Sequence, residues 1–229
     1  TNIPNGGDGA GRASVADFDG DGNNELAIVS KNRLHLYETD GSIKWTLNSI
    51  DNSSKTSATA FDFEGDGNME VVYRDEQNLR ILDGVTGNVK DILGCVSGTR
   101  VEMPVVADVD ADGETEICVS CGSNTRVYTS DQTPWMPTRK VWNSVHYVPT
   151  FINDDLTIPA QRQPKATTAG KDLYAAQVPI TDPAGNLIYP ALPDFMVTFD
   201  SSTIASCDSD STLVHVTICN DDANALLYN

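Results

Sequence analysis

A nine-residue acidic pattern, D-x-D-x-D-G-x-x-E, most constrains what this chain can fold into. It covers residues 17–25 and returns at 62–70, with Glu64 at the second acidic position, and at 108–116. The copies begin 45 and then 46 residues apart. Carboxylates crowded this closely repel one another unless a cation lies among them, and oxygen ligands favour hard cations such as Ca²⁺. The sequence therefore predicts three repeated units, each with a metal-binding loop.

Short apolar or alternating segments flank each acidic loop in the same order. One precedes the loop, one follows it directly, and a third with alternating polarity comes next. In the first two repeats a fourth follows a glycine-containing turn. The expected strands are 13–16, 26–29, 33–37 and 43–47, then 57–61, 71–73, 79–82 and 89–93, then 104–107, 117–119 and 126–128. Four short strands every ~45 residues are typical of a β-propeller blade.

A helical calcium module is the alternative interpretation of the acidic pattern. An EF-hand places its bidentate acid at position 12 and flanks its loop with amphipathic helices. Here the last acid is at position 9 of the loop, and the flanks are short, β-branched and without a helical stripe. The pattern therefore favours an all-β fold.

These repeats, over about residues 10–145, resemble FG-GAP/VCBS repeats, the blades of integrin-α-like propellers. The resemblance implies that each loop joins the first two strands of a blade and binds Ca²⁺, which gives three calcium sites. The implied side-chain ligands are Asp17, Asp19, Asp21 and Glu25; Asp62, Glu64, Asp66 and Glu70; and Asp108, Asp110, Asp112 and Glu116. The implied backbone-carbonyl ligands belong to Asn23, Asn68 and Glu114.

Two departures from the family pattern affect the predicted sites. Glu64 stands where aspartate is usual, so its longer side chain could displace the ion or bind it through water. Glutamate also replaces the common aspartate at the last position of all three loops, which bidentate binding tolerates. The glycine at position 6 of each loop, Gly22, Gly67 or Gly113, fits a reversal of the backbone with positive φ.

Three repeats are too few for a closed propeller, which has typically four to eight blades. We therefore expect a partial propeller, and a chain that belongs to a longer protein or assembly. The expected division is three propeller blades at 1–147, a propeller exit segment and linker at 148–193, and the start of another domain at 194–229. A closed three-bladed ring would need a further element that relieves its strain.

The segments after the third repeat carry two further resemblances. Residues 134–159 are similar to the tail that follows such propellers in large surface proteins of gliding Bacteroidetes. Trp135 and Trp142 in this tail are expected to pack in the core rather than stack on a ligand, and the run 153–155 to cap a turn rather than contact another cation. Residues 194–229 resemble the first strands of an Ig-like β-sandwich of the CARDB kind, but provide too few strands for a whole sandwich.

Five cysteines bear on the compartment. Cys207 and Cys219 could join neighbouring strands, and Cys95 could pair with Cys121 or with Cys118; five buried thiols are the alternative. Calcium loops of low affinity need millimolar calcium, and disulfides need an oxidising environment. Together these features predict an extracellular, secreted or cell-surface protein.

Charge and motifs exclude several function classes. The net charge of −18 argues against nucleic acid or an anionic membrane surface as partner. No apolar run approaches the ~20 residues of a membrane-spanning helix, so direct membrane insertion is not expected. The sequence contains no H-E-x-x-H, G-x-S-x-G or phosphate-binding glycine loop. Carboxylates that hold a cation stay ionised, which does not suit a general acid, so no enzyme activity is expected.

The resulting hypothesis is a non-enzymatic, calcium-stabilised propeller segment of a large cell-surface adhesin or gliding and attachment protein. Its expected partner is a protein or glycan ligand on a surface. Two alternatives stay open: a carbohydrate-binding accessory module of a secreted polysaccharide-active enzyme, and a structural subunit of a surface filament.

Overall fold

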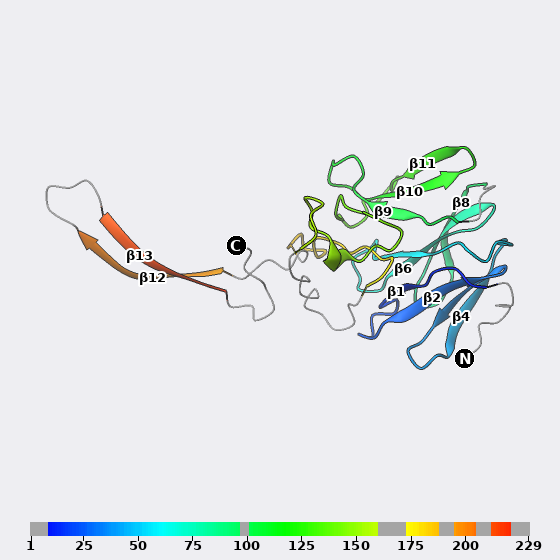
Figure 1. Cartoon of the computed structure of the whole chain (residues 1–229), viewed down its shortest axis with the longest axis horizontal. Coiled ribbons are helices and arrows are strands. Elements are labelled where there is room, and N and C mark those ends of the chain that lie inside the picture. Colours follow the sequence, from blue (N-terminus) through cyan, green and yellow to red (C-terminus); the bar gives the residue numbers. More distant parts are fainter. Residues whose placement is uncertain (1–8, 97–100, 160–172, 188–194, 205–211, 221–229) are drawn as a thin grey trace.

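The computed structural model describes residues 9–96, 101–159 and 173–187, together with the backbone of two later strands. Within these residues the fold is all-β, with several antiparallel sheets and no α-helix (Figure 1). A short 3-10 helix, η2, covers Pro149–Phe151. No helix in this part of the chain is long and apolar enough to cross a membrane.

Each acidic repeat forms one antiparallel sheet in which neighbouring strands follow one another along the chain. The first sheet contains β1 (Ser14–Ala16), β2 (Glu25–Ser30), β3 (Arg33–Tyr37) and β4 (Ile43–Asn48). The second contains β5 (Thr59–Phe61), β6 (Glu70–Arg74), β7 (Asn78–Leu82) and β8 (Val89–Gly94). The third contains β9 (Val105–Ala107), β10 (Glu116–Cys121) and β11 (Asn124–Tyr128).

The strand positions agree with the expected ones to within a few residues. The first two sheets also share a feature of their register. Each has a bulge near the end of its third strand, between Leu36 and Tyr37 in the first sheet and between Ile81 and Leu82 in the second. The four-stranded expectation holds for these two sheets, whereas the third has three strands among the described residues.

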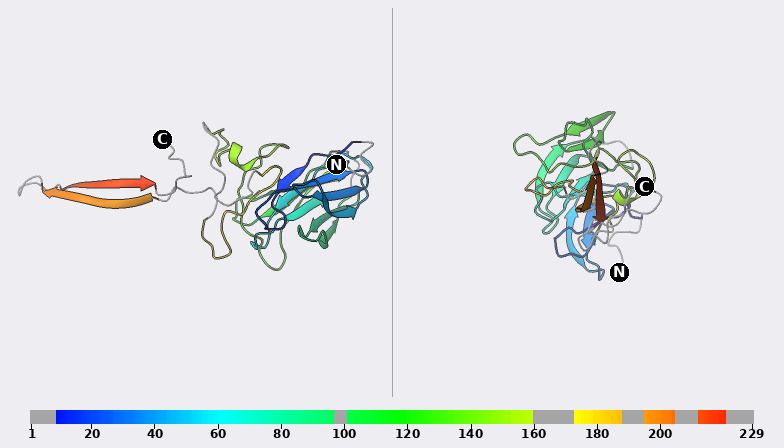
Figure 2. Two further views of the ribbon diagram at one scale, coloured as in Figure 1. Left: turned by 90° about the horizontal axis from the view of Figure 1, so that it is seen from below. Right: turned by 90° about the vertical axis from the view of Figure 1, so that its left-hand side faces the viewer.

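The sheets lie side by side, and their packing determines which strands are buried (Figures 1 and 2). The first and second sheets share one hydrophobic cluster, and the second and third share another. The second sheet is therefore covered on both faces, and all five residues of β6 are buried. The fourth strands β4 and β8 are mostly exposed or half-buried.

Gly84 allows the first two sheets to approach closely at one point. A Cβ atom at this position would lie 2.4 Å from the backbone oxygen of Phe18 and 2.1 Å from that of Met69. The indole of Trp45 in β4 also donates a hydrogen bond of 2.7 Å to the Gly84 carbonyl oxygen. A side chain at residue 84 would push the two sheets apart.

A later segment, Leu173 to Val178, runs along the inner strands of the sheets. The backbone of Tyr174 exchanges hydrogen bonds with Val15 of β1, and the Gln177 amide donates to the Ala60 carbonyl oxygen of β5 at 2.8 Å. The Gln177 side chain then reaches the third sheet, where Nε2 donates to the Val106 carbonyl oxygen of β9 at 3.3 Å. This part of the predicted exit segment and linker is therefore packed into the core, where it contacts all three sheets.

The tail before that segment is organised by Arg139, which is buried. Its guanidinium donates to the carbonyl oxygens of Pro149 and Ile152, at 2.9 and 2.8 Å, and pairs with Asp154 at 2.6 Å. Asp155 accepts a hydrogen bond of 2.9 Å from the Thr157 amide and so caps the turn.

The two tryptophans of the tail pack against other aromatic rings. Trp135 meets Phe63 at a ring distance of 4.7 Å, and Trp142 stacks on Tyr147 at 4.3 Å. Both tryptophans are half-buried and pack against hydrophobic clusters.

The structure contains a disulfide between Cys95 and Cys121, and Cys118 keeps a free thiol. This bond joins the end of the second sheet to β10, so the second and third sheets are linked covalently as well as by packing. For the other candidate pair, Cys207 lies outside the described residues and the side chain of Cys219 is not described.

The last described elements are β12 (Phe195–Ile204) and β13 (Thr212–Asn220), which pair as an antiparallel hairpin. They lie in the segment 194–229 that resembles the first strands of a further domain. An Ig-like domain and the boundaries 1–147, 148–193 and 194–229 stay predictions.

Candidate metal centres

The pairing of the first two strands in each sheet brings the two ends of each acidic loop together. Ala16 pairs with Glu25 in the first sheet, Phe61 with Glu70 in the second, and Ala107 with Glu116 in the third. The first aspartate of each loop directly follows the first of these residues. Strand register therefore places the first and last acids of every loop on the same corner of its sheet.

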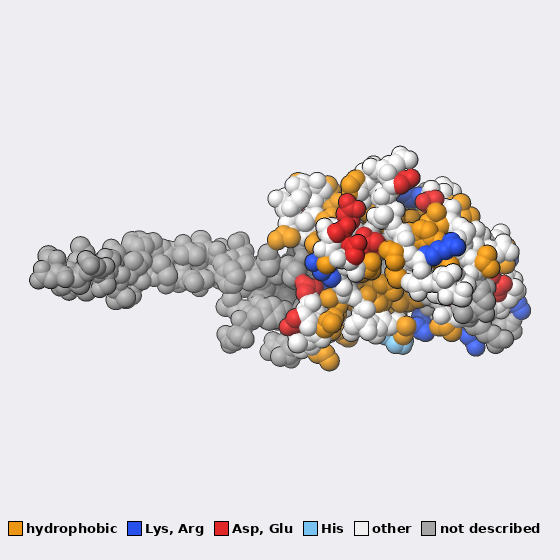
Figure 3. Space-filling model, turned by 90° about the horizontal axis from the view of Figure 1, so that it is seen from above, with side chains coloured by type: hydrophobic (Ala, Val, Ile, Leu, Met, Phe, Trp, Pro, Cys, Tyr) orange, Lys and Arg blue, Asp and Glu red, His pale blue; other side chains and the backbone are white. Residues whose placement is uncertain are grey.

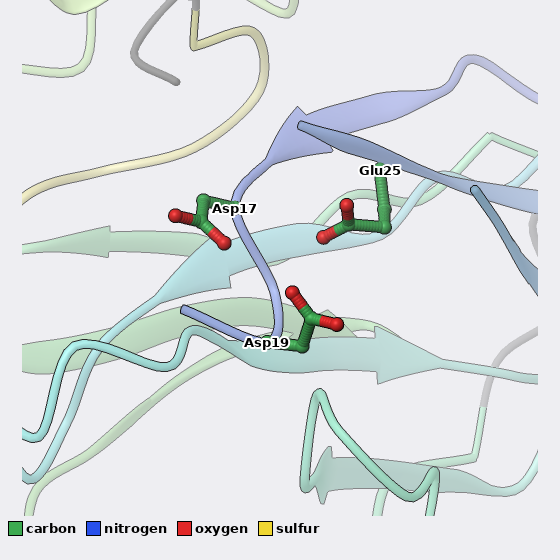
Figure 4. Close-up of side chains that lie close together, drawn as sticks. All are labelled: Asp17, Asp19 and Glu25. Carbon is green, nitrogen blue, oxygen red and sulfur yellow. The ribbon is translucent and has the colours of Figure 1, made fainter. Parts of the chain in front are cut away.

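Three carboxylates converge at each of these corners. The clusters are Asp17, Asp19 and Glu25; Asp62, Glu64 and Glu70; and Asp108, Asp110 and Glu116. In each cluster, one oxygen from each residue lies within 4.8 Å of the others. Figure 4 shows the first cluster, with its carboxylates directed toward a common space. Each cluster could hold a metal ion.

Backbone amides within each loop hold the carboxylates in these positions. The glycine at position 6 has positive φ in all three loops, as predicted, and its amide donates to the first aspartate. In the first loop this bond joins the Gly22 amide to Asp17 Oδ2 at 3.0 Å, and the Phe18 amide donates to Glu25 Oε2 at 2.8 Å. The other loops repeat both bonds. One oxygen of each of these acids is thus fixed by the loop.

The middle aspartates behave differently from the other predicted ligands. Asp21, Asp66 and Asp112 are not part of the three clusters. Their side chains accept hydrogen bonds of 2.7–2.8 Å from the amides of residues 23, 68 and 114. In this structure they shape the turn of the loop, and their role as ligands stays a prediction, as does that of the carbonyl groups at 23, 68 and 114.

Buried carboxylate oxygens without hydrogen-bond partners show that two of the clusters fit a cation. These atoms are Asp17 Oδ1, Glu25 Oε1 and Asp108 Oδ1. The three residues are 8%, 0% and 3% exposed. An unpaired buried polar group costs about 1–3 kcal/mol, and more when it is charged. A hard cation bound among these oxygens would remove that cost.

Two lysines beside the clusters were not identified from the sequence. Lys44 Nζ lies 2.6 Å from Asp19 Oδ2, and Lys90 Nζ lies 2.5 Å from Glu64 Oε1 and 3.0 Å from Glu70 Oε1. Both are the second residue of the fourth strand in their sheet. This shared position could have identified them from the sequence, because it places both side chains at the end of the sheet where the acidic loop lies.

Burial changes the ionisation of the last acid in each loop. It raises the pKa of Glu25 to about 7, with a smaller contribution from the negative charges of Asp19, Glu38 and Asp17. Burial likewise raises the pKa of Glu70 to about 8 and raises the pKa of Glu116. These pKa shifts express the cost of keeping the carboxylates charged without a cation. Acidic side chains also gather on one face of the molecule among hydrophobic ones (Figure 3).

The raised pKa of Glu25 predicts an effect of pH on the metal-free protein. A carboxyl whose pKa is higher in the folded than in the unfolded state stabilises the fold at low pH, and this contribution is lost as pH rises through about 7. In calcium-depleted buffer, Glu25→Gln should therefore melt close to wild type at pH 4.5, the ordinary pKa of the group, but above it at pH 8. At pH 8 with calcium the order should reverse. Thermal melts of both proteins check this, and a metal-free wild type that melts above the variant at pH 8 would contradict it.

Comparison with known families supports the repeat interpretation over part of the chain. A family model described as FG-GAP-like repeat matches residues 17–73. The match begins at the first acidic loop and ends in β6, so it includes two of the three loops. No curated protein matches the chain.

Solved structures provide a second comparison. The crystal structure of the V. cholerae biofilm matrix protein Bap1 is similar with a TM-score of 0.56 and 25% identity, over 68% of this chain and 28% of that chain. This chain thus spans less than a third of that protein.

Two rhamnogalacturonan lyases also align. They are PL11 of Bacillus licheniformis, at 18% identity over 48% of this chain and 30% of that chain, and YesW, at 17% identity over 54% and 35%. Both TM-scores are 0.36, so no argument rests on them.

Proposed function

We propose that this chain is a calcium-stabilised β-propeller segment with a non-enzymatic role in adhesion outside the cell. The observation that carries the proposal is the repeated acidic cluster at the same corner of each sheet, with buried, unpaired carboxylate oxygens in two of the three. Ca²⁺ suits such sites because it takes six to eight oxygen ligands in flexible geometry. Its role here is to hold the first two strands of each blade together.

The arrangement of the sheets supports the propeller part of the proposal. Each sheet is an antiparallel meander whose first strand is buried and whose fourth strand, where present, is largely exposed. The first strands β1, β5 and β9 lie next to one another. These are the relations that blades have around a propeller axis. The segment from Leu173 to Val178 forms hydrogen bonds with all three of these first strands.

Two observations support an extracellular role in adhesion. The similar protein Bap1 is a biofilm matrix protein. The disulfide between Cys95 and Cys121 suits an oxidising compartment. A relation to gliding proteins of Bacteroidetes, a CARDB-type neighbour and a filament role stay predictions.

A pocket at the other end of the sheets favours carbohydrate binding as a second candidate function. Its volume is about 370 Å³, and its lining includes Arg12, Ser120, Trp142, Asn143 and Ser144. Arg12 precedes β1 and Ser120 lies late in β10, so the pocket is remote from the acidic loops. An aromatic ring beside amide, hydroxyl and guanidinium groups can stack on a sugar and bind its hydroxyls.

Binding of the calcium-loaded chain to arrayed glycans and to extracellular matrix preparations tests both candidates. The adhesion role predicts binding to matrix material that is lost on chelation. The carbohydrate role predicts glycan binding that falls at least about tenfold in Asn143→Ala and in Trp142→Ala. Asn143 is exposed, so Asn143→Ala tests sugar binding without disturbing the stacked rings of Trp142 and Tyr147. Binding to neither surface would contradict both candidates.

A further inference from the structure

We propose that Lys90 occupies the cation position of the second acidic loop, so that this loop binds Ca²⁺ much more weakly than the first and third. The three loops are then unequal, and the chain holds two calcium ions tightly instead of three. The inference rests on the calcium role proposed above. It means that Lys90, a residue outside the loops, determines which loops bind Ca²⁺.

The ammonium group of Lys90 lies within reach of two of the three clustered acids. Its Nζ is 2.5 Å from Glu64 Oε1 and 3.0 Å from Glu70 Oε1. The side chain of Glu70 is almost fully buried, and that of Lys90 is one-third exposed. A divalent cation bound by Glu64 and Glu70 would have to displace this ammonium group, because like charges repel at such distances.

Hydrogen bonding distinguishes the second loop from the other two. Asp62 Oδ1 accepts from the Gly65 amide at 2.7 Å, and its Oδ2 accepts from the Gly67 amide at 2.9 Å. Glu70 Oε2 accepts a hydrogen bond from the Phe63 amide at 3.0 Å, and Glu70 Oε1 accepts one from the Lys90 ammonium group. Both buried acids of this loop are therefore fully paired without a metal.

The first and third loops leave buried oxygens unpaired instead. In the first loop these are Asp17 Oδ1 and Glu25 Oε1, and in the third the atom is Asp108 Oδ1. Among the residues that the structure describes, no lysine or arginine forms an ion pair with the third cluster. A cation bound in these loops gains ligands that no protein group already uses.

The equivalent lysine of the first repeat is held away from its buried glutamate. Lys44 Nζ bonds Asp19 Oδ2 at 2.6 Å and also Glu38 Oε1 at 2.8 Å, and Glu38 follows the third strand directly. It thus contacts one acid of the cluster and leaves Glu25 Oε1 without a partner.

The second repeat has Asp83 at the position of Glu38. This shorter side chain accepts bonds of 2.7 and 2.6 Å from the amide and hydroxyl of Thr86, and so serves the turn. Lys90 therefore forms no ion pair with Asp83, and its ion pairs among the described residues are with the cluster acids Glu64 and Glu70. Glu64, one methylene longer than the Asp19 that it replaces, is extended to the Lys90 ammonium group. Two substitutions between the repeats, at the positions of Glu38 and Asp19, thus account for the different lysine positions.

Calcium titration of the full chain by calorimetry and native mass spectrometry tests the inference. Wild type should bind two ions tightly and a third at least about tenfold more weakly. Lys90→Met keeps the aliphatic part of the side chain but removes the charge, so it should bind three ions tightly. Lys55→Met is the matched control, because it removes the charge of an exposed lysine that precedes β5, at the end of the sheet away from the loop. This control should still bind two ions tightly.

Thermal melting provides a second readout that does not depend on counting ions. Without calcium, Lys90→Met should melt below wild type, because Glu70 then loses the partner of its buried carboxylate. Calcium should raise the melting temperature of this variant more than that of wild type. Three equal sites in wild type, or an unchanged number of tight sites in Lys90→Met, would overturn the role of Lys90. Failure of every variant to bind calcium would instead overturn the calcium role itself.

Discussion

Chelation of calcium is expected to lower the melting temperature of this chain by about 10–20 °C. Each tight site stabilises the fold by RT ln(1 + [Ca]/Kd), which is about 2.7 kcal/mol when calcium is 100 times Kd. Two such sites contribute about 5 kcal/mol, and 1 kcal/mol shifts the melting temperature by about 2–4 °C for a chain of this size. The effect is large because the ions hold together buried acids that otherwise repel one another.

Differential scanning calorimetry at pH 8, in calcium and in excess EGTA, measures this shift. A double variant, Glu25→Gln with Glu116→Gln, should lose most of the response to calcium. Glu76→Gln serves as the control, since Glu76 lies between β6 and β7, at the end of the second sheet away from its acidic loop. An unchanged melting temperature in excess EGTA would contradict the calcium role, whatever the fold.

Gln177→Leu is expected to destabilise the fold by about 3 kcal/mol. The Gln177 side chain is fully buried, and its Nε2 donates to the carbonyl oxygens of Val106 and Val141 at 3.3 and 3.2 Å. Its Oε1 accepts from the Tyr147 hydroxyl at 2.9 Å. Leucine has a similar volume but removes these bonds from the buried Val106 and Val141 carbonyl groups and takes the acceptor from the Tyr147 hydroxyl, and an unsatisfied buried group costs about 1–3 kcal/mol.

Urea unfolding at constant calcium concentration measures this loss. Tyr147→Phe removes only the hydroxyl from the same network and should cost about 1 kcal/mol. Gln77→Leu, at an exposed turn position, should stay within about 0.5 kcal/mol of wild type. If Gln177→Leu were no more destabilising than Gln77→Leu, the segment from Leu173 to Val178 would not be holding the three sheets together.

Much of the local structure was predictable because it depends on neighbouring residues. Alternation of apolar and polar side chains placed the strands, and the glycine at position 6 of each loop indicated the positive φ that Gly22, Gly67 and Gly113 adopt. The acidic pattern also indicated three clusters, although one member of each predicted side-chain set, Asp21, Asp66 or Asp112, shapes the loop instead of joining its cluster.

The lysines and the disulfide were harder to predict because they depend on pairing between strands. Lys90 meets Glu70 only because β6, β7 and β8 form one sheet whose register brings their side chains together. Cys95 could have met Cys118 or Cys121, which lie on the same strand. Alternation along β10 turns Cys121 toward the buried side, where the sulfur atoms of Cys95 and Cys121 bond.

By itself, the sequence determined the repeat, the strand order and the corner at which each acidic cluster forms, since all of these follow from contacts within about 45 residues. The tertiary structure alone decided how the inner strands are covered and which cluster is already paired. Gln177 follows Ala60 of β5 by 117 positions and Val106 of β9 by 71. It can bond to both strands only after the three sheets have packed side by side. No local pattern contains that information, because a hydrogen-bonding side chain in a Pro- and Ala-rich segment has many possible partners until the core forms.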